Sequence, residues 1–188
     1  MNERDPALLD AGFRAAVDDV RAACAKRGVA MRPFFCLRHP ATQAKLWRQS
    51  RSREEIENGG TRSTRHGLKH LRAAKCHYLV SVIESVGPQS GPWATNAFPG
   101  NSWHQWGFAE DDFWLVNGSA IWSIRKKING VNGYKVWAEE ATRLGLRSLS
   151  SIGDWPHIQH PRESSPMKRH TLTEINAAMQ ERFAQEAA

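Results

Sequence analysis

The sequence predicts an α+β fold in which helices surround a small, mainly antiparallel sheet. Three short apolar stretches, at residues 30–38, 107–116 and 155–160, are typical of buried strands. Residues 119–123 follow the second stretch closely enough to form its hairpin partner, which favours antiparallel pairing. Longer segments elsewhere in the chain carry apolar residues at helical spacing.

The first predicted helix starts near the N-terminus. Asp5 is a suitable N-cap, Pro6 suits the first helical position, and Gly28 can end the helix. Its apolar residues recur at helical spacing: Leu9, Phe13, Ala16, Val17, Val20 and Cys24.

A second, shorter helix is predicted after the first strand. Arg38 ends that strand, and the helix begins after Pro40. It carries Gln43, Leu46 and Trp47.

The middle of the chain is predicted to be a basic helical region. Asn58-Gly59-Gly60 breaks the chain, and a long helix is expected over residues 62–86. One face of it is apolar, and the other carries a cationic stripe at helical spacing: Arg62, Arg65, Lys69 and Arg72. Loop 87–103 follows and leads into the first motif described below.

The last part of the chain holds the remaining elements. A helix is expected over about 133–144, and the strand at 155–160 carries His157. Thr171 and Glu174 form a capping-box pattern that opens a terminal helix. That helix has a net charge of −2 and is expected to pack on the core.

Length and composition favour one soluble domain with an anionic partner. The 188 residues are interpreted as a single catalytic domain over 1–188, with a core at 30–160, an inserted basic helical region at about 53–95 and a terminal helix at about 171–186. The formal net charge of +7 suits nucleic acid, a cell-envelope polymer or an acidic membrane surface. We expect a monomer.

The cysteines and the apolar pattern indicate where in the cell the protein is made and acts. The three cysteines, Cys24, Cys36 and Cys76, form no paired motif and are expected to be buried free thiols. No apolar stretch approaches the roughly 20 residues of a membrane span. The N-terminus has no apolar signal region, so the chain is expected to be made in the cytoplasm and to reach the cell wall after release or export.

Two motifs indicate a metal site built for hydrolysis. The first runs from Ser102 through His104 and Gly107 to Asp111, and the second is Asp154-Trp-Pro-His157. Two histidines and one carboxylate leave one position of a tetrahedral zinc ion open for water.

Simpler interpretations compete with this one. A single histidine is more often a surface or core residue than a ligand. Glu110 and Asp112 compete with Asp111, and His160 competes with His157, so spacing alone leaves the ligand set open.

The same residues carry a resemblance to a known family. Ser102, His104, Gly107, Ala109 and Asp111, followed by Asp154 and His157, resemble the D-Ala-D-Ala carboxypeptidase and L-alanyl-D-glutamate endopeptidase family, which includes VanY-like enzymes and phage endolysins. The segment with Arg38, Gln43 and Trp47 is similar to the upstream helix of that family. The resemblance covers about residues 30–160 and implies a hedgehog/DD-peptidase-like fold.

The resemblance also implies roles for individual residues. It implies His104, Asp111 and His157 as Zn²⁺ ligands, Asp154 as the catalytic base, and Arg38 as the cation that stabilises the oxyanion. The expected substrate is the peptidoglycan stem peptide. The expected activity is that of a phage-type L-alanyl-D-glutamate endopeptidase. A D-Ala-D-Ala carboxypeptidase and an antibacterial effector with the same chemistry are the alternatives.

Further residues are expected to lie near the substrate. Trp106 and Trp155 adjoin the ligands and could form the walls of a groove, Ser102 could hydrogen-bond near the site, and Gln43 belongs to the upstream motif. Core packing is the more common place for such aromatic residues. The stretch between Arg38 and His104 is longer than the resemblance leads us to expect for the endopeptidase branch, and the predicted cationic helix falls in this extra length.

A function of another class stays open at this stage. His66 and His70 lack the glutamate of a zincin motif, because Gly67 follows His66, and they are interpreted as part of the basic face. That face and the charge of +7 could instead belong to a non-enzymatic module that binds nucleic acid or the envelope. No stable nucleic-acid partner is expected under the peptidase interpretation.

Overall fold

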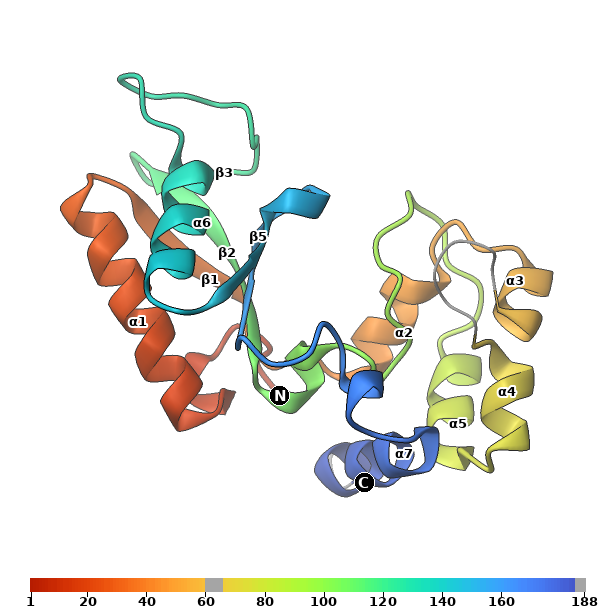
Figure 1. Ribbon diagram of the computed structural model, residues 1–188. Coiled ribbons are helices and arrows are strands. Elements are labelled where there is room, and N and C mark those ends of the chain that lie inside the picture. Colours follow the sequence, from red (N-terminus) through yellow and green to blue (C-terminus); the bar gives the residue numbers. More distant parts are fainter. Residues whose placement is uncertain (60–65, 185–188) are drawn as a thin grey trace. The chain divides into compact units, whose positions relative to one another are not determined.

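The computed structural model describes residues 1–59 and 66–184 and confirms the α+β class (Figure 1). The described residues form one five-stranded antiparallel sheet and seven α-helices. The chain divides into two compact units. A sheet unit contains residues 2–37 and 106–162, and a helical unit contains residue 1 with residues 38–105 and 163–188.

All strands belong to the sheet unit. They are β1 (Ala30–Phe35), β2 (Ala109–Val116), β3 (Ser119–Ile121), β4 (Arg147–Leu149) and β5 (Asp154–Gln159). The order is β1-β2-β5-β4, and β3 pairs with β2. Strand β2 is therefore central, with its first residues paired to β5 and its last residues paired to β3.

Helices α1 (Ala11–Lys26) and α6 (Gly133–Arg143) cover one face of this sheet. Their apolar residues pack with those that β1, β2 and β5 direct to the same side. This core includes Phe13, Val17, Val20, Met31, Trp114, Tyr134, Trp137 and Ile158. Side chains alternate between the two faces of the sheet along β2, so Asp111 and Phe113 lie on the face opposite this core.

The helical unit is built from short helices. They are α2 (Pro40–Arg48), α3 (Arg53–Asn58), α4 (Leu68–Ala73), α5 (His77–Ser85) and α7 (Leu172–Phe183). Helix α7 packs on α5 through Ile175 and Met179, which are fully buried. Gly100, at φ +87°, makes this packing possible, because a Cβ atom there would lie 2.4 Å from Ile175 Cγ2.

The N-terminal helix begins later than predicted. Asp5 and Pro6 start a 3₁₀ helix, η1 (Pro6–Leu8), rather than α1. Helix α1 begins at Ala11, where the Asp10 carboxylate accepts hydrogen bonds from the amides of Gly12 and Phe13. A second acidic cap five residues downstream of the first therefore sets the true start.

The prediction of one long helix over 62–86 is wrong. Helices α4 and α5 are separate, and Lys75 between them adopts a left-handed conformation with φ +57°. The Cys76 amide donates to the Leu71 carbonyl, which ends α4. Arg62 and Arg65 of the predicted stripe lie outside the described residues.

Several expectations are confirmed, and two elements were missed. The predicted strands, the 119–123 hairpin partner, the 133–144 helix and the Thr171–Glu174 capping box are all present to within a few residues. Helix α3 and strand β4 were not predicted. The chain divides into two compact units, and the single catalytic domain stays a prediction. None of the described helices is long and apolar enough to cross a membrane.

Candidate metal site

Three residues from different parts of the chain form a group that could hold a metal ion. One ligand atom from each of His104, Asp111 and His157 can be chosen so that all three atoms lie within 4.8 Å of one another. Both histidines are buried and Asp111 is half-buried. The group contains the three residues that the motifs predicted.

The sheet register positions two of these residues. Asp111 on β2 lies directly opposite His157 on β5. Directly paired residues of an antiparallel sheet extend to the same face, and here the His157 Nδ1 atom is 2.9 Å from Asp111 Oδ1. The backbone hydrogen bonds of the sheet therefore hold this pair, independently of any loop.

Gln159 orients the His157 ring. It lies two residues along β5, on the same face, and its Oε1 atom is 3.1 Å from His157 Nε2. With the proton on Nε2 donated to Gln159, the neutral ring turns a lone pair on Nδ1 toward the Asp111 oxygen. A proton on Nδ1 would instead make this 2.9 Å contact a hydrogen bond, and a metal ion held by the two atoms could take the place of that proton.

The electrostatics of His157 agree with this geometry. Burial alone would lower the pKa of His157. The hydrogen bond and negative charge of Asp111, together with the charge of Asp154, outweigh burial and raise that pKa above its ordinary value. The site therefore favours a positive charge at His157, whether it comes from a proton or from a metal ion.

His104 lies in a short 3₁₀ helix, η2 (Trp103–Trp106), at the end of the helical unit. Its ring is almost fully buried, and its carbonyl accepts a hydrogen bond of 3.3 Å from the Arg38 amide. The chain passes from the helical unit to the sheet unit within η2, between Gln105 and Trp106. Gly107 follows at φ +76°, where a Cβ atom would lie 3.1 Å from the Asp10 amide nitrogen.

Arg38 and Gln43 belong to a buried hydrogen-bonded chain in the helical unit. Arg38 donates to Gln43 Oε1 at 3.0 Å, and Gln105 Nε2 donates to the same oxygen at 3.2 Å. Gln43 in turn donates to the Ala97 carbonyl at 2.7 Å. Gln43 is fully buried, and it holds Arg38 and Gln105 through these hydrogen bonds. Its predicted contact with substrate stays a prediction.

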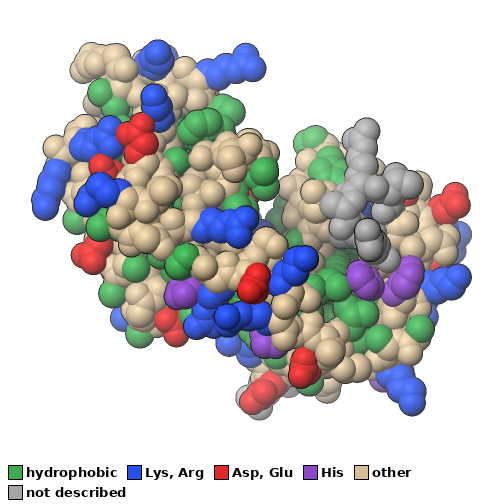
Figure 2. All heavy atoms as spheres, viewed as in Figure 1, with side chains coloured by type: hydrophobic (Ala, Val, Ile, Leu, Met, Phe, Trp, Pro, Cys, Tyr) green, Lys and Arg blue, Asp and Glu red, His purple; other side chains and the backbone are tan. Residues whose placement is uncertain are grey.

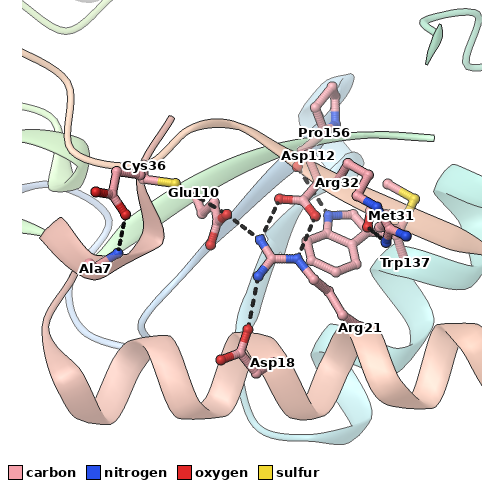
Figure 3. A network of polar contacts seen from close by, with 11 residues as sticks. Ala7, Asp18, Arg21, Met31, Arg32, Cys36, Glu110, Asp112, Trp137 and Pro156 are labelled. Carbon is pink, nitrogen blue, oxygen red and sulfur yellow. Dashed lines mark hydrogen bonds and ion pairs between the residues drawn. The ribbon is translucent and has the colours of Figure 1, made fainter. Parts of the chain in front are cut away.

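The acidic neighbours of Asp111 lie on the other face of β2. Glu110 and Asp112 are fully buried and bind the guanidinium of Arg21 from α1, as Figure 3 shows. The Asp112 carboxylate binds Arg21 in bidentate fashion at 2.9 and 3.0 Å. Cys36 also donates to Glu110, at 3.3 Å. The alternation of β2 therefore separates the competing carboxylates, and only Asp111 joins the histidines.

Burial dominates the protonation of this carboxylate pair. Burial and the charge of Asp112 raise the pKa of Glu110 to about 8, although Arg21 lowers it. A proton on Glu110 leaves Arg21 paired with the Asp112 charge. The buried group behind Asp111 is then close to neutral.

Asp154 opens β5 and is exposed. Its negative charge acts on His157. Trp155 next to it packs against the core of the sheet unit and lines a shallow cavity with Ala138 and Thr142 of α6. The predicted role of Trp155 as a groove wall stays a prediction.

The other predicted residues lie close in sequence to the group. Ser102 is half-buried, and its carbonyl accepts from the Gln105 amide as η2 begins. Trp106 is half-buried at the end of η2. His160, the competitor of His157, makes a ring contact with Phe108 and is not among the three grouped residues.

Sequence reasoning missed an aromatic cluster on the same face as Asp111. Phe35 pairs with Asp111 across β1 and β2, and Phe113 lies two residues along β2. Trp122 contacts Phe113 at a tilted angle and Phe34 edge-on, with ring centroids 5.7 and 4.7 Å apart. The period of two in 109–116, applied from Asp111, could have identified Phe113.

The chain matches no protein-family model and no curated protein.

Proposed function

We propose that the protein is a zinc-dependent peptidoglycan hydrolase that cleaves the stem peptide, as an L-alanyl-D-glutamate endopeptidase of the phage endolysin type. The grouping of His104, Asp111 and His157 carries this proposal. The motifs in which these residues lie resemble the endopeptidase and carboxypeptidase family. A hedgehog/DD-peptidase-like arrangement of the sheet is part of the same proposal.

The donor set suits zinc. Two imidazoles and one carboxylate are the ligands of many catalytic zinc sites, and the bond between His157 and Gln159 supplies the outer contact that such ligands use. Non-haem Fe(II) can use the same three donors. The motif resemblance favours zinc, and metal analysis of the purified protein separates the two ions.

Each proposed role has a physical reason. Bound zinc would lower the pKa of a water molecule to about 7 and polarise the scissile carbonyl. Asp154 is exposed and acts on His157 by its charge, so it suits the general base that takes a proton and returns it to the leaving amine. Arg38 is buried and held by Gln43, so its charge is preorganised to stabilise an oxyanion.

The aromatic cluster gives the site a proposed substrate wall. Phe35 and Phe113 share a sheet face with Asp111 and are half-buried. Flat apolar surface beside a few polar groups is typical of small-molecule and peptide sites. We assign to this wall the apolar parts of the stem peptide and its neighbouring sugar.

Two alternatives share the same metal chemistry. A D-Ala-D-Ala carboxypeptidase would release free D-alanine, and an antibacterial effector would use the same cut in another setting. In each case the enzyme would act on the cell wall after release or export, as a monomer.

The non-enzymatic basic module receives less support. Lysine and arginine side chains are visible on both units in Figure 2. Arg72 of the predicted stripe is paired with Glu57 and Glu84, and these three side chains together carry a charge of −1. The described part of the stripe thus retains only Lys69 as an exposed, unneutralised cation.

Purified peptidoglycan tests the proposal. The protein is incubated with sacculi, with and without a chelator, and the released fragments are identified by mass spectrometry. New D-glutamate N-termini that disappear with the chelator and return with zinc are expected. Chelator-sensitive release of D-alanine would support the carboxypeptidase instead, and no cleavage by the zinc-loaded protein would contradict the proposal.

A further inference from the structure

The helical unit contains a second feature that the proposed function does not use. A cavity of about 510 Å³ lies among α2, α3, α4 and α5. Its charged lining consists of four arginines and two glutamates: Arg48, Arg51, Arg53, Arg72, Glu57 and Glu84. Ile56, Leu68 and Pro88 supply apolar surface.

One arginine uses both glutamates. Arg72 binds Glu57 through one terminal nitrogen and Glu84 through the other, each at 2.6 Å. Both glutamates therefore pair with Arg72. The other arginines of the lining are Arg48, Arg51 and Arg53.

Arg51 is buried without a carboxylate partner. It is 8% exposed, and its terminal nitrogens donate to the carbonyls of Trp47 and Thr95. Its guanidinium carbon is 3.8 Å from the Trp93 ring centroid. The charge of Glu55 acts on it, yet within residues 1–59 and 66–184 no carboxylate oxygen comes within ion-pair distance. Burial lowers the pKa of Arg51 to about 10, because keeping the guanidinium charged away from water costs free energy.

Arg48 is in a similar position. One terminal nitrogen donates to the Ile83 carbonyl at 2.8 Å, and burial lowers the pKa of Arg48. The Nε atoms of both Arg48 and Arg51 are buried and, in the part of the chain that is described, have no hydrogen-bond partner. No ion pair with a carboxylate forms at either guanidinium in that part of the chain, and their positive charge favours an anion in the cavity that both residues line.

The charge balance indicates which anion. Four arginine charges against two glutamate charges leave +2 among the residues that line the cavity, and the charge of Glu55 acts on Arg51 from outside this lining. A phosphate monoester carries about −1.5 to −2 at neutral pH and has three acceptor oxygens, whereas a single carboxylate carries one charge. The volume of about 510 Å³ lies within the range of small-molecule sites and exceeds the size of a bare phosphate ion.

We propose that this cavity binds the phosphate monoester of a small molecule with a sugar-sized body. Arg48 and Arg53 hold the phosphate, Arg51 adds its charge from the wall of the cavity, and Ile56, Leu68 and Pro88 contact the body. The inference does not rest on the proposed peptidase activity and involves none of the three metal-site residues.

Calorimetric titration of the metal-free protein tests the inference, so its failure is distinct from failure of the peptidase proposal. The probes are glucose 6-phosphate, inorganic phosphate and glucose. Saturable 1:1 binding of glucose 6-phosphate with a Kd below about 1 mM is expected, with weaker binding of inorganic phosphate and none of glucose. Equal affinity for inorganic phosphate would overturn the ester assignment, and no saturable phosphate binding would overturn the site.

Matched variants separate a built site from diffuse charge. Arg53→Gln removes an exposed lining arginine, and Arg48→Gln removes a half-buried one. Each loses a charge-assisted hydrogen bond, so each should raise the Kd about tenfold or more. Arg147→Gln makes the same charge change on exposed β4 and should leave the Kd unchanged. If Arg48→Gln does not fold, Arg53→Gln decides; equal losses in Arg53→Gln and Arg147→Gln would overturn the proposal.

Discussion

Asp111 and His157 face each other across neighbouring strands, with Asp111 Oδ1 2.9 Å from His157 Nδ1. The register of β2 and β5 fixes this pair, and Gln159 holds the far nitrogen of the same ring. Two ligands of the candidate site are thus preorganised by backbone hydrogen bonds in the sheet unit. This arrangement makes the role of each residue testable by substitution.

Replacing Gln159 with leucine should weaken metal binding without unfolding the sheet. The ring of His157 would lose the acceptor that keeps the proton on Nε2, and loss of such an outer contact typically costs about 10–100-fold in metal affinity. Competition titration with a zinc-sensitive dye measures the effect. Gln159→Glu retains an acceptor oxygen and should keep most of the affinity. Equal zinc affinity in wild type and Gln159→Leu would show that this contact does not orient the ligand.

Replacing Asp154 with asparagine should separate metal binding from turnover. The metal-ligating atoms stay in place, but the group proposed to transfer protons is lost, which typically lowers kcat about 10²–10⁴-fold. Zinc content and the rate of stem-peptide cleavage are measured on the same preparation. Asp19→Asn, an exposed change of equal charge on α1, serves as control. Full activity of Asp154→Asn would remove Asp154 from the mechanism.

Replacing Arg21 with methionine should destabilise the sheet unit. It leaves Glu110 and Asp112 buried together without their cation, and removal of one partner of a buried ion pair costs about 3–5 kcal/mol. Urea unfolding measures the loss. Asp18 binds the same arginine from an exposed position, so Asp18→Asn should cost less than about 1 kcal/mol.

The loss in Arg21→Met should grow with pH. Burial already raises the pKa values of Glu110 and Asp112, and loss of Arg21 raises them further above their unfolded values of about 4. Groups whose pKa is higher in the folded state contribute stability below the unfolded pKa, and that contribution disappears as pH rises through the folded pKa. The deficit should therefore be larger at about pH 8 than at about pH 5. An equal deficit at both pH values would show that losing Arg21 does not change the protonation of the two carboxylates in the folded protein over this range.

The motifs predicted the three residues that the structure groups together, but spacing alone could not choose Asp111 over its acidic neighbours. Glu110, Asp111 and Asp112 are consecutive, and the choice follows from which strand face α1 covers. Arg21 supplies the partner for the two buried acids from a site about 90 residues earlier, as the sequence separation of 91 to Asp112 shows. Such a long-range pair leaves no local pattern. Gln159 and Gln105 were missed because an amide is neither a charge signal nor a ligand signal.

Local signals account for the elements that were predicted well or badly. The capping box at Thr171 and Glu174 gave the start of α7, because both reciprocal hydrogen bonds involve residues three apart. The break between α4 and α5 occurs at Lys75, with neither glycine nor proline to mark it. Tertiary packing of Leu71, Cys76 and Leu79 sets that break, and all three are buried.

The three free cysteines should be unreactive in the native protein. Cys24, Cys36 and Cys76 are buried and form no disulfide, as the sequence predicted, and burial raises the pKa of Cys24 to about 12. At about pH 8 the reactive thiolate of Cys24 is then about 10⁻⁴ of the total. Labelling by a thiol reagent, followed by mass spectrometry, should be slow without denaturant and complete in it. Rapid labelling of Cys24 or Cys36 in the native state would contradict the observed packing.

Zinc stoichiometry tests the central claim most directly. Metal content and affinity are measured for the wild type and for His104→Ala, Asp111→Asn and His157→Ala, each checked for folding by circular dichroism. One zinc ion per chain in the wild type, and loss of tight binding in each folded variant, is the predicted result. A wild-type protein that binds no zinc, or folded variants that bind it as tightly as the wild type, would contradict the account.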